Sequence, residues 1–122
     1  MAFIAQLHNS LATTMILFMV VCGLWGLVSA FGGGVSGSYA GALVLGEGLI
    51  LAQGVLGILA YLTGLRPAQG LHFLYGLTAA LTLPGIYSYV RNRSNQIQAL
   101  WYGGGALFIV GLAIRGILTG RG

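Results

Sequence analysis

Four long apolar stretches, separated by short breaks, are the feature that most constrains how this 122-residue chain can fold. They cover residues 2–31, 40–65, 68–90 and 99–119. Each is long enough to cross a bilayer as a helix, which takes about 20 mainly apolar residues. Only 5% of the chain is charged, whereas a soluble domain carries about 25% charged residues. The sequence therefore predicts an integral membrane protein.

The breaks and the length of the stretches predict helices rather than strands. Backbone groups in lipid must be satisfied internally, so only helices and closed barrels span a membrane. These stretches are too uniformly apolar for the alternating strands of a barrel. The breaks at residues 32–38, 64–67 and 91–96 are short, and short loops make successive helices antiparallel neighbours. We expect an all-α fold, in which residues 1–122 form one up-and-down bundle of four transmembrane helices.

The arginines give an orientation. We call side A the end of the bundle that holds both termini and the second loop, and side B the opposite end. Arg66, Arg115 and Arg121 fall toward side A, and Arg91 and Arg93 toward side B. The positive-inside rule then favours cytoplasmic termini, and we expect a bacterial inner or plasma membrane. Scattered arginines do not form a nucleic-acid surface.

Aromatic residues gather toward side B, where they predict an interfacial belt. These residues are Trp25, Tyr39, Tyr87, Tyr89, Trp101 and Tyr102.

His8 and His72 are the only histidines. Each lies near the start of an odd-numbered stretch, and odd-numbered helices of such a bundle run in the same direction. Both imidazoles are therefore expected about 8 Å along their helices, at a similar depth on side A. Neutral imidazole is the usual nitrogen donor to haem iron, and bundle cores are common cofactor sites. The spacing predicts one metal centre, a haem b, shared by His8 and His72.

Small and basic residues near the histidines extend this hypothesis. Ala12 and Gly76 lie one turn beyond the histidines and leave room for a flat macrocycle. Arg115 and Arg66 belong to the same layer and could pair with haem propionates. Two alternatives stay open: the histidines are interfacial polar residues near helix ends, or each binds a separate chlorophyll-type pigment.

Glu47, the only acidic residue, lies roughly 10 Å inside the second stretch from side B. An intramembrane carboxyl is a functional-site hypothesis by default. Tyrosines at a similar level, among them Tyr39 and Tyr102, could hydrogen-bond it. Glu47 and Tyr102 are therefore candidates for a proton or quinone site. The alternative is a protonated Glu47 that bonds a neighbouring helix.

The pattern resembles the four-helix membrane b-type cytochromes and one half of haem A synthase. The residues that carry the resemblance are Leu7-His8, Leu71-His72, Ala12 and Gly76. Both families hold haem with histidines on bundle helices, so the resemblance implies a haem-binding bundle. Those families often carry more histidines. With two, this chain can hold at most one bis-histidine haem, so electrons could not cross the bilayer through it alone.

No nucleophile–base arrangement, phosphate loop or zinc-ligand spacing is present in the sequence, which gives no support to an independent enzyme. We expect an integral-membrane subunit that binds one haem b for electron transfer within a larger respiratory or photosynthetic complex. The first alternative is a non-catalytic accessory subunit that packs against core subunits or pigments. A small transporter or channel, suggested by Glu47, is the third hypothesis.

Overall fold

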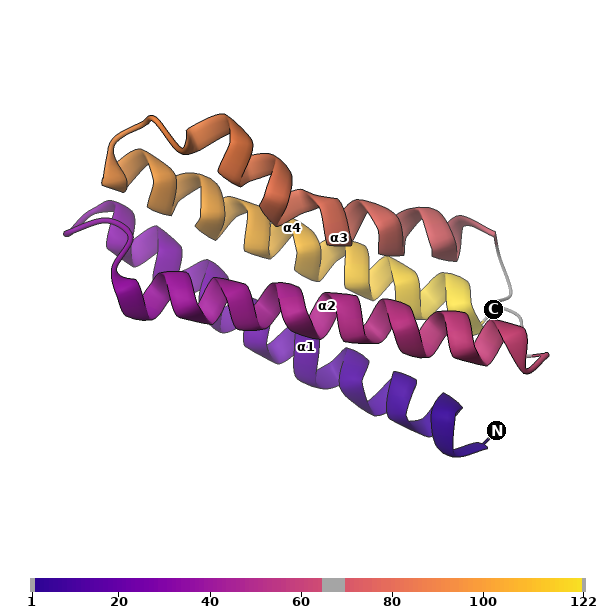
Figure 1. Cartoon of the computed structure of the whole chain (residues 1–122). Coiled ribbons are helices and arrows are strands. Elements are labelled where there is room, and N and C mark those ends of the chain that lie inside the picture. The colour runs from indigo at the N-terminus through magenta and orange to yellow at the C-terminus, as the bar shows by residue number, and fades with distance from the viewer. Residues whose placement is uncertain (1, 65–69, 122) are drawn as a thin grey trace.

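The computed structural model describes residues 2–64 and 70–121, which fold into a four-helix bundle (Figure 1). The helices are α1 (Ala2–Ala30), α2 (Gly37–Leu62), α3 (Leu71–Val90) and α4 (Asn95–Arg121). Each is long and apolar enough to cross a membrane, by length and composition. The predicted all-α class with four transmembrane helices is confirmed, and the apolar helices indicate a lipid bilayer environment.

The ends of α2 follow from capping. Its first residue is Gly37, earlier than predicted, because the Ser36 side chain accepts a hydrogen bond from the Tyr39 N–H at 3.1 Å. Serine at this position satisfies a backbone donor that has no partner within the helix. At the other end Gly64 has φ +100°, a left-handed conformation that glycine adopts without steric cost. Gly64, in the break predicted at residues 64–67, thus terminates α2, whose last residue is Leu62.

The start of α4 is also earlier than predicted. Ser94 Oγ accepts a hydrogen bond from the Ile97 N–H at 3.3 Å, so the helix begins at Asn95. Polar residues that the sequence placed in a loop therefore form its first turn. The described part of α3 begins at Leu71. The predicted start of this stretch, at residue 68, lies outside the described residues.

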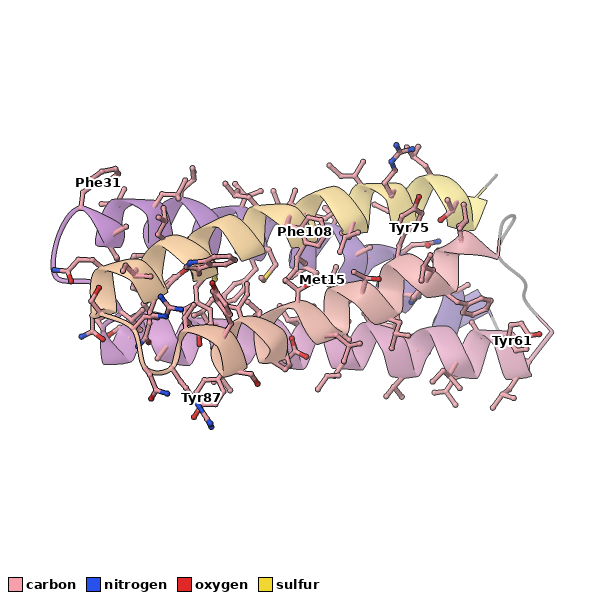
Figure 2. All side chains as sticks on the ribbon, turned by 90° about the horizontal axis from the view of Figure 1, so that it is seen from above. Met15, Phe31, Tyr61, Tyr75, Tyr87 and Phe108 are labelled. Atoms are coloured by element: carbon pink, nitrogen blue, oxygen red, sulfur yellow. The ribbon has the colours of Figure 1, made fainter. Side chains whose placement is uncertain are left out.

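Successive helices are neighbours, and α4 closes the bundle by packing against α1. The most extensive contact is between α1 and α4, and the least extensive between neighbours is between α2 and α3. Helices α1 and α3 are therefore diagonal. Figure 1 shows both termini at one end, and Figure 2 places Tyr61 at that end and Phe31 and Tyr87 at the opposite one.

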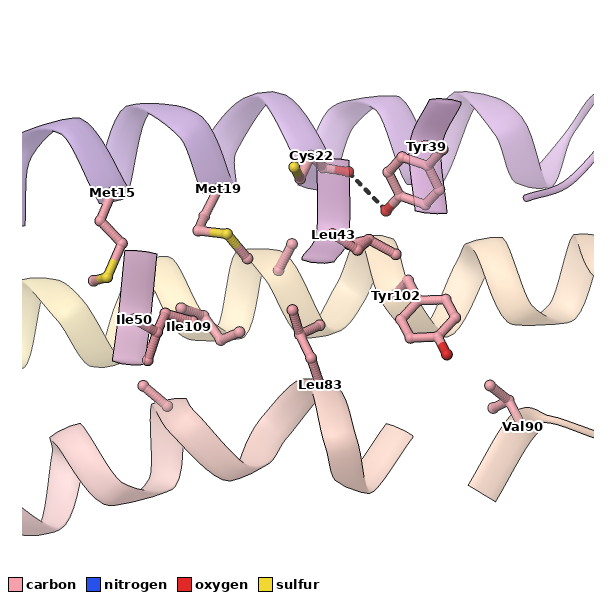
Figure 3. Close-up of a cluster of buried hydrophobic side chains, with 12 residues drawn as sticks. Met15, Met19, Cys22, Tyr39, Leu43, Ile50, Leu83, Val90, Tyr102 and Ile109 are labelled. Carbon is pink, nitrogen blue, oxygen red and sulfur yellow. Dashed lines mark hydrogen bonds between the residues drawn. The ribbon is translucent and has the colours of Figure 1, made fainter. Parts of the chain in front are cut away.

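The hydrophobic core occupies the middle of the bundle and its side B half (Figure 3). On α2 the buried residues recur every three or four positions, the spacing of one helix face. Members of the core from all four helices are Met15, Met19, Cys22, Tyr39, Leu43, Ile50, Ala79, Leu83, Val90, Tyr102, Ala106 and Ile109.

Three glycines bring the backbones of α1 and α4 into contact. A Cβ atom on Gly103 would lie 2.8 Å from the Leu27 backbone nitrogen and 3.0 Å from the Gly23 carbonyl oxygen. A Cβ atom on Gly26 would lie 2.7 Å from the Gly103 Cα and would overlap the Tyr39 hydroxyl. Small residues are how membrane helices approach closely, because lipid is as apolar as leucine. We call this contact the glycine seam.

Tyr39 is fully buried beside the glycine seam. Its hydroxyl donates a hydrogen bond to the Cys22 carbonyl oxygen at 2.9 Å (Figure 3), and its ring lies 5.1 Å from that of Trp25. Tyr102 is also buried. The predicted interfacial belt was wrong for these two tyrosines, because both lie on the inward faces of their helices. Its exposed members are Trp25, Tyr87, Tyr89 and Trp101.

Candidate functional site

The structure brings His8 and His72 together near side A. Their ring centres lie 6.1 Å apart, with the ring planes at 67°. His8 belongs to α1, and His72 is the second residue of α3. These helices are diagonal in the bundle, so the two half-buried imidazoles meet across its interior.

His72 is held by the backbone of α4. Its Nδ1 lies 2.7 Å from the Gly116 carbonyl oxygen. A carbonyl only accepts, so Nδ1 carries the hydrogen, and in the neutral ring Nε2 keeps its lone pair. Metal-binding histidines are commonly arranged in this way, with the second ring nitrogen bonded to a backbone carbonyl. The contact therefore sets the tautomer in which His72 can bind a metal through Nε2.

His8 is enclosed by α2. A Cβ atom on Gly57 would lie 3.3 Å from His8 Cε1, so the absence of a side chain at Gly57 leaves room for the His8 ring. Gln53 Nε2 donates a hydrogen bond to the His8 carbonyl oxygen at 2.6 Å. Within the described part of the chain, His8 Nδ1 and Gln53 Oε1 are buried without a hydrogen-bond partner. Such atoms are rare in native proteins and call for an explanation, of which a binding role is one.

All four helices thus contribute to the histidine site, which we define as His8, Gln53, Gly57, His72 and Gly116. Gln53, Gly57 and Gly116 were not among the residues predicted for this site. A signal existed for two of them, because Gln53 and Gly57 continue the inward face of α2 with the same three- and four-residue spacing. Gly116 carried no signal, since it acts through its carbonyl oxygen, which every residue has.

The other residues predicted for this site have different surroundings. Ala12 is buried on α1. Gly76 is exposed, and a Cβ atom there would meet nothing within 4 Å. Arg115 has an exposed side chain and directly precedes Gly116, which holds His72. Arg66 lies outside the described residues. The open position thus lies one turn from His72 at an exposed site of α3, and the cation lies one residue from the backbone anchor of His72.

Glu47 and Tyr102 are not joined to this site. Glu47 is half-buried in α2, and its Oε1 is buried without a hydrogen-bond partner among the described residues. No tyrosine therefore bonds that oxygen. Tyr39, one of the tyrosines expected near it, donates its hydroxyl to Cys22 instead. Tyr102 lies in the hydrophobic core.

The donor set of the histidine site distinguishes between kinds of metal centre. No group of three or more His, Cys, Asp or Glu side chains that could hold a metal ion occurs in the described ranges. A bare zinc ion takes three or four protein ligands. Haem iron takes its axial ligands from the protein, because the macrocycle supplies the others. The two imidazoles therefore suit a metal macrocycle better than a bare ion.

The separation of the two imidazoles is compatible with the binding of one metal ion by both. Their ring centres lie 6.1 Å apart, a separation that leaves room for one metal ion between them with bonds of about 2 Å to each imidazole. Comparison with models of known protein families, with curated proteins and with solved structures finds no match for this chain.

Proposed function

We propose that this chain is an integral-membrane subunit that binds one haem b through His8 and His72. It would serve electron transfer within a larger respiratory or photosynthetic complex. The observation that carries the proposal is the meeting of the two imidazoles across the bundle at 6.1 Å. The hydrogen bond from His72 Nδ1 to the Gly116 carbonyl supports it, because it frees Nε2 for the metal.

A bound haem would supply a one-electron redox centre, with the protein setting its ligands and surroundings. The chain's own residues perform the remaining tasks. Gly116 fixes the ring orientation of His72 through its carbonyl. Gly57 allows α2 to pack directly on the ring of His8. Arg115 places a cation near side A, where it can pair with a propionate.

The proposal requires a partner for electron exchange. Two histidines can hold one bis-histidine haem, so this chain contains no second haem of that kind to pass the electron onward. The outer faces of the bundle suit contact with lipid or with other membrane subunits, because all four helices expose large apolar side chains. Examples are Leu17, Leu45, Leu77 and Phe108.

A reduced-minus-oxidised optical spectrum tests the proposal, recorded on the full chain produced with ample haem. We expect b-type bands in the unmodified protein and their loss in His8→Ala and in His72→Ala. Ser88→Ala is the control, because Ser88 is an exposed residue near the opposite end of α3. Unmodified protein without bands would reject haem binding. Bands that survive in both histidine variants would show that the ligands lie elsewhere.

A haem-free result would favour the accessory-subunit hypothesis. Aromatic rings in edge-to-face contact have centres about 4.5–7 Å apart, and the histidine rings fall within this range. The pair would then be a packing contact between α1 and α3. A tetrapyrrole absorption spectrum that does not change on reduction would instead indicate a chlorophyll-type pigment.

A further inference from the structure

A shallow hollow of about 610 Å³ lies on the outer surface of the bundle, formed mainly by α3 and α4. Its size is within the range of small-molecule sites, about 300–1,000 Å³. Its lining is almost entirely apolar and includes Leu27, Ile86, Trp101, Gly104 and Phe108. The hollow exists where Gly104, an exposed residue, lacks a side chain between two larger aromatic neighbours.

An aromatic pair connects this hollow to a cation in the third loop. The Trp101 ring, which lines the hollow, lies 4.9 Å from the Tyr89 ring. The Arg93 guanidinium carbon lies 5.3 Å from the centre of the same Tyr89 ring. Gln98 Nε2 donates to the Arg93 carbonyl oxygen at 2.9 Å, which ties this part of the loop to α4. Arg93 is thus positioned at the side B end of an apolar groove.

The charge of Arg93 is not balanced by a protein carboxylate side chain. Glu47 is the only acidic residue of the chain, and it lies within the span of α2. Basic residues at a membrane surface attract anionic lipid headgroups. An apolar groove that ends at an exposed cation matches an amphiphile in which an anionic group is joined to a hydrocarbon chain.

We propose that the hollow and Arg93 together bind one phospholipid that carries a net negative headgroup. The lipid phosphate pairs with the Arg93 guanidinium, and one acyl chain lies in the hollow over Gly104. Tyr89 lies between Arg93 and Trp101, which lines the hollow, at a level where amphipathic aromatic rings are favoured. This site lies toward side B and does not depend on haem binding at the histidine site.

Native mass spectrometry of the full chain in neutral detergent tests the headgroup contact. Phosphatidylglycerol and phosphatidylcholine with identical acyl chains serve as the probes. We expect phosphatidylglycerol to be retained preferentially and its retention to fall about fivefold in Arg93→Gln, the effect of one basic residue at a membrane surface. Arg91→Gln is the matched control, with the same change of charge in the same loop, and should lose less. Equal retention of the two lipids, or equal losses in the two variants, would overturn the proposal.

A second pair of variants tests whether an acyl chain lies in the hollow. Gly104→Leu fills the hollow, whereas Gly111→Leu adds the same side chain to another exposed position of α4. Neither added Cβ meets an atom within 4 Å, and leucine favours a helix more than glycine does, so both variants should fold. We expect only Gly104→Leu to lose phosphatidylglycerol. Undiminished lipid retention, with loss of a dimer in Gly104→Leu, would show that a second copy of the chain occupies the hollow.

Discussion

The side A and side B halves of this bundle differ in what fills the space between their helices. Toward side B, the glycine seam brings α1 and α4 into backbone contact, and the buried Tyr39 hydroxyl has a carbonyl partner. Toward side A, the interior holds two half-buried histidines, with His8 Nδ1 and Gln53 Oε1 buried and unpaired in the described structure. One half is closed by small residues, and the other keeps polar side chains in an apolar interior.

This difference indicates how stability and function are divided along the helices. A buried polar group without a partner costs about 1–3 kcal/mol, and ionisable residues inside a membrane are usually functional. The glycine seam gains van der Waals contact without any such cost. We therefore expect substitutions in the glycine seam to reduce the free energy of unfolding. Substitutions near the histidines should change cofactor binding and leave stability largely intact.

The largest loss of stability is expected for Gly26→Ala. The added methyl group would meet the Tyr39 hydroxyl of α2 and the Gly103 backbone, and the Gly103 backbone can give way only if α4 moves away from α1. Overpacking of this kind costs about 1–3 kcal/mol. Equilibrium unfolding in mixed micelles measures the change, with Gly111→Ala as the control because its Cβ position is open. Equal stability of the two variants would show that the glycine seam does not determine the stability of the side B half of the bundle.

A smaller loss is expected for Tyr39→Phe. The ring keeps its contact with Trp25, but the hydrogen bond to the Cys22 carbonyl is removed. One such bond contributes about 1 kcal/mol. The same unfolding measurement applies, and Tyr87→Phe at an exposed position is the matched control. A loss as large as that of Gly26→Ala would mean that the hydroxyl, and not the backbone contact, holds α1 in place.

The smallest change in stability, within about 0.5 kcal/mol, is expected for Gly76→Leu, because the position is exposed and open. Haem retention should nevertheless fall, since the new side chain occupies the space one turn beyond His72. Gly85→Leu, at another open position of α3, is the control. Optical spectra and unfolding curves of the same samples separate the two effects. If both variants retain haem equally, no macrocycle lies beside Gly76.

Part of the histidine site could be predicted from the sequence, and part could not. His8 and His72 lie near the starts of two parallel stretches, and these positions predicted that the two residues lie at a similar depth in the membrane. Gln53 could have been placed with them from the regular spacing of the inward residues of α2. The anchoring of His72 by Gly116 could not, because a backbone carbonyl has no signature in the sequence. For the same reason, nothing in the sequence predicted that Tyr39 would donate to Cys22.

The sequence by itself determined the membrane environment, the four helices and their antiparallel order. Apolar length, low charge and short loops act locally, so they can be read without knowing which helices touch. Only the tertiary structure decided which glycines form the close contact between α1 and α4, since Gly26 and Gly103 are far apart in the chain. It also decided that the His8 and His72 rings lie in contact, with their centres 6.1 Å apart. The rotation of each helix about its own axis sets both outcomes, and that rotation is fixed by the packing of all four helices together.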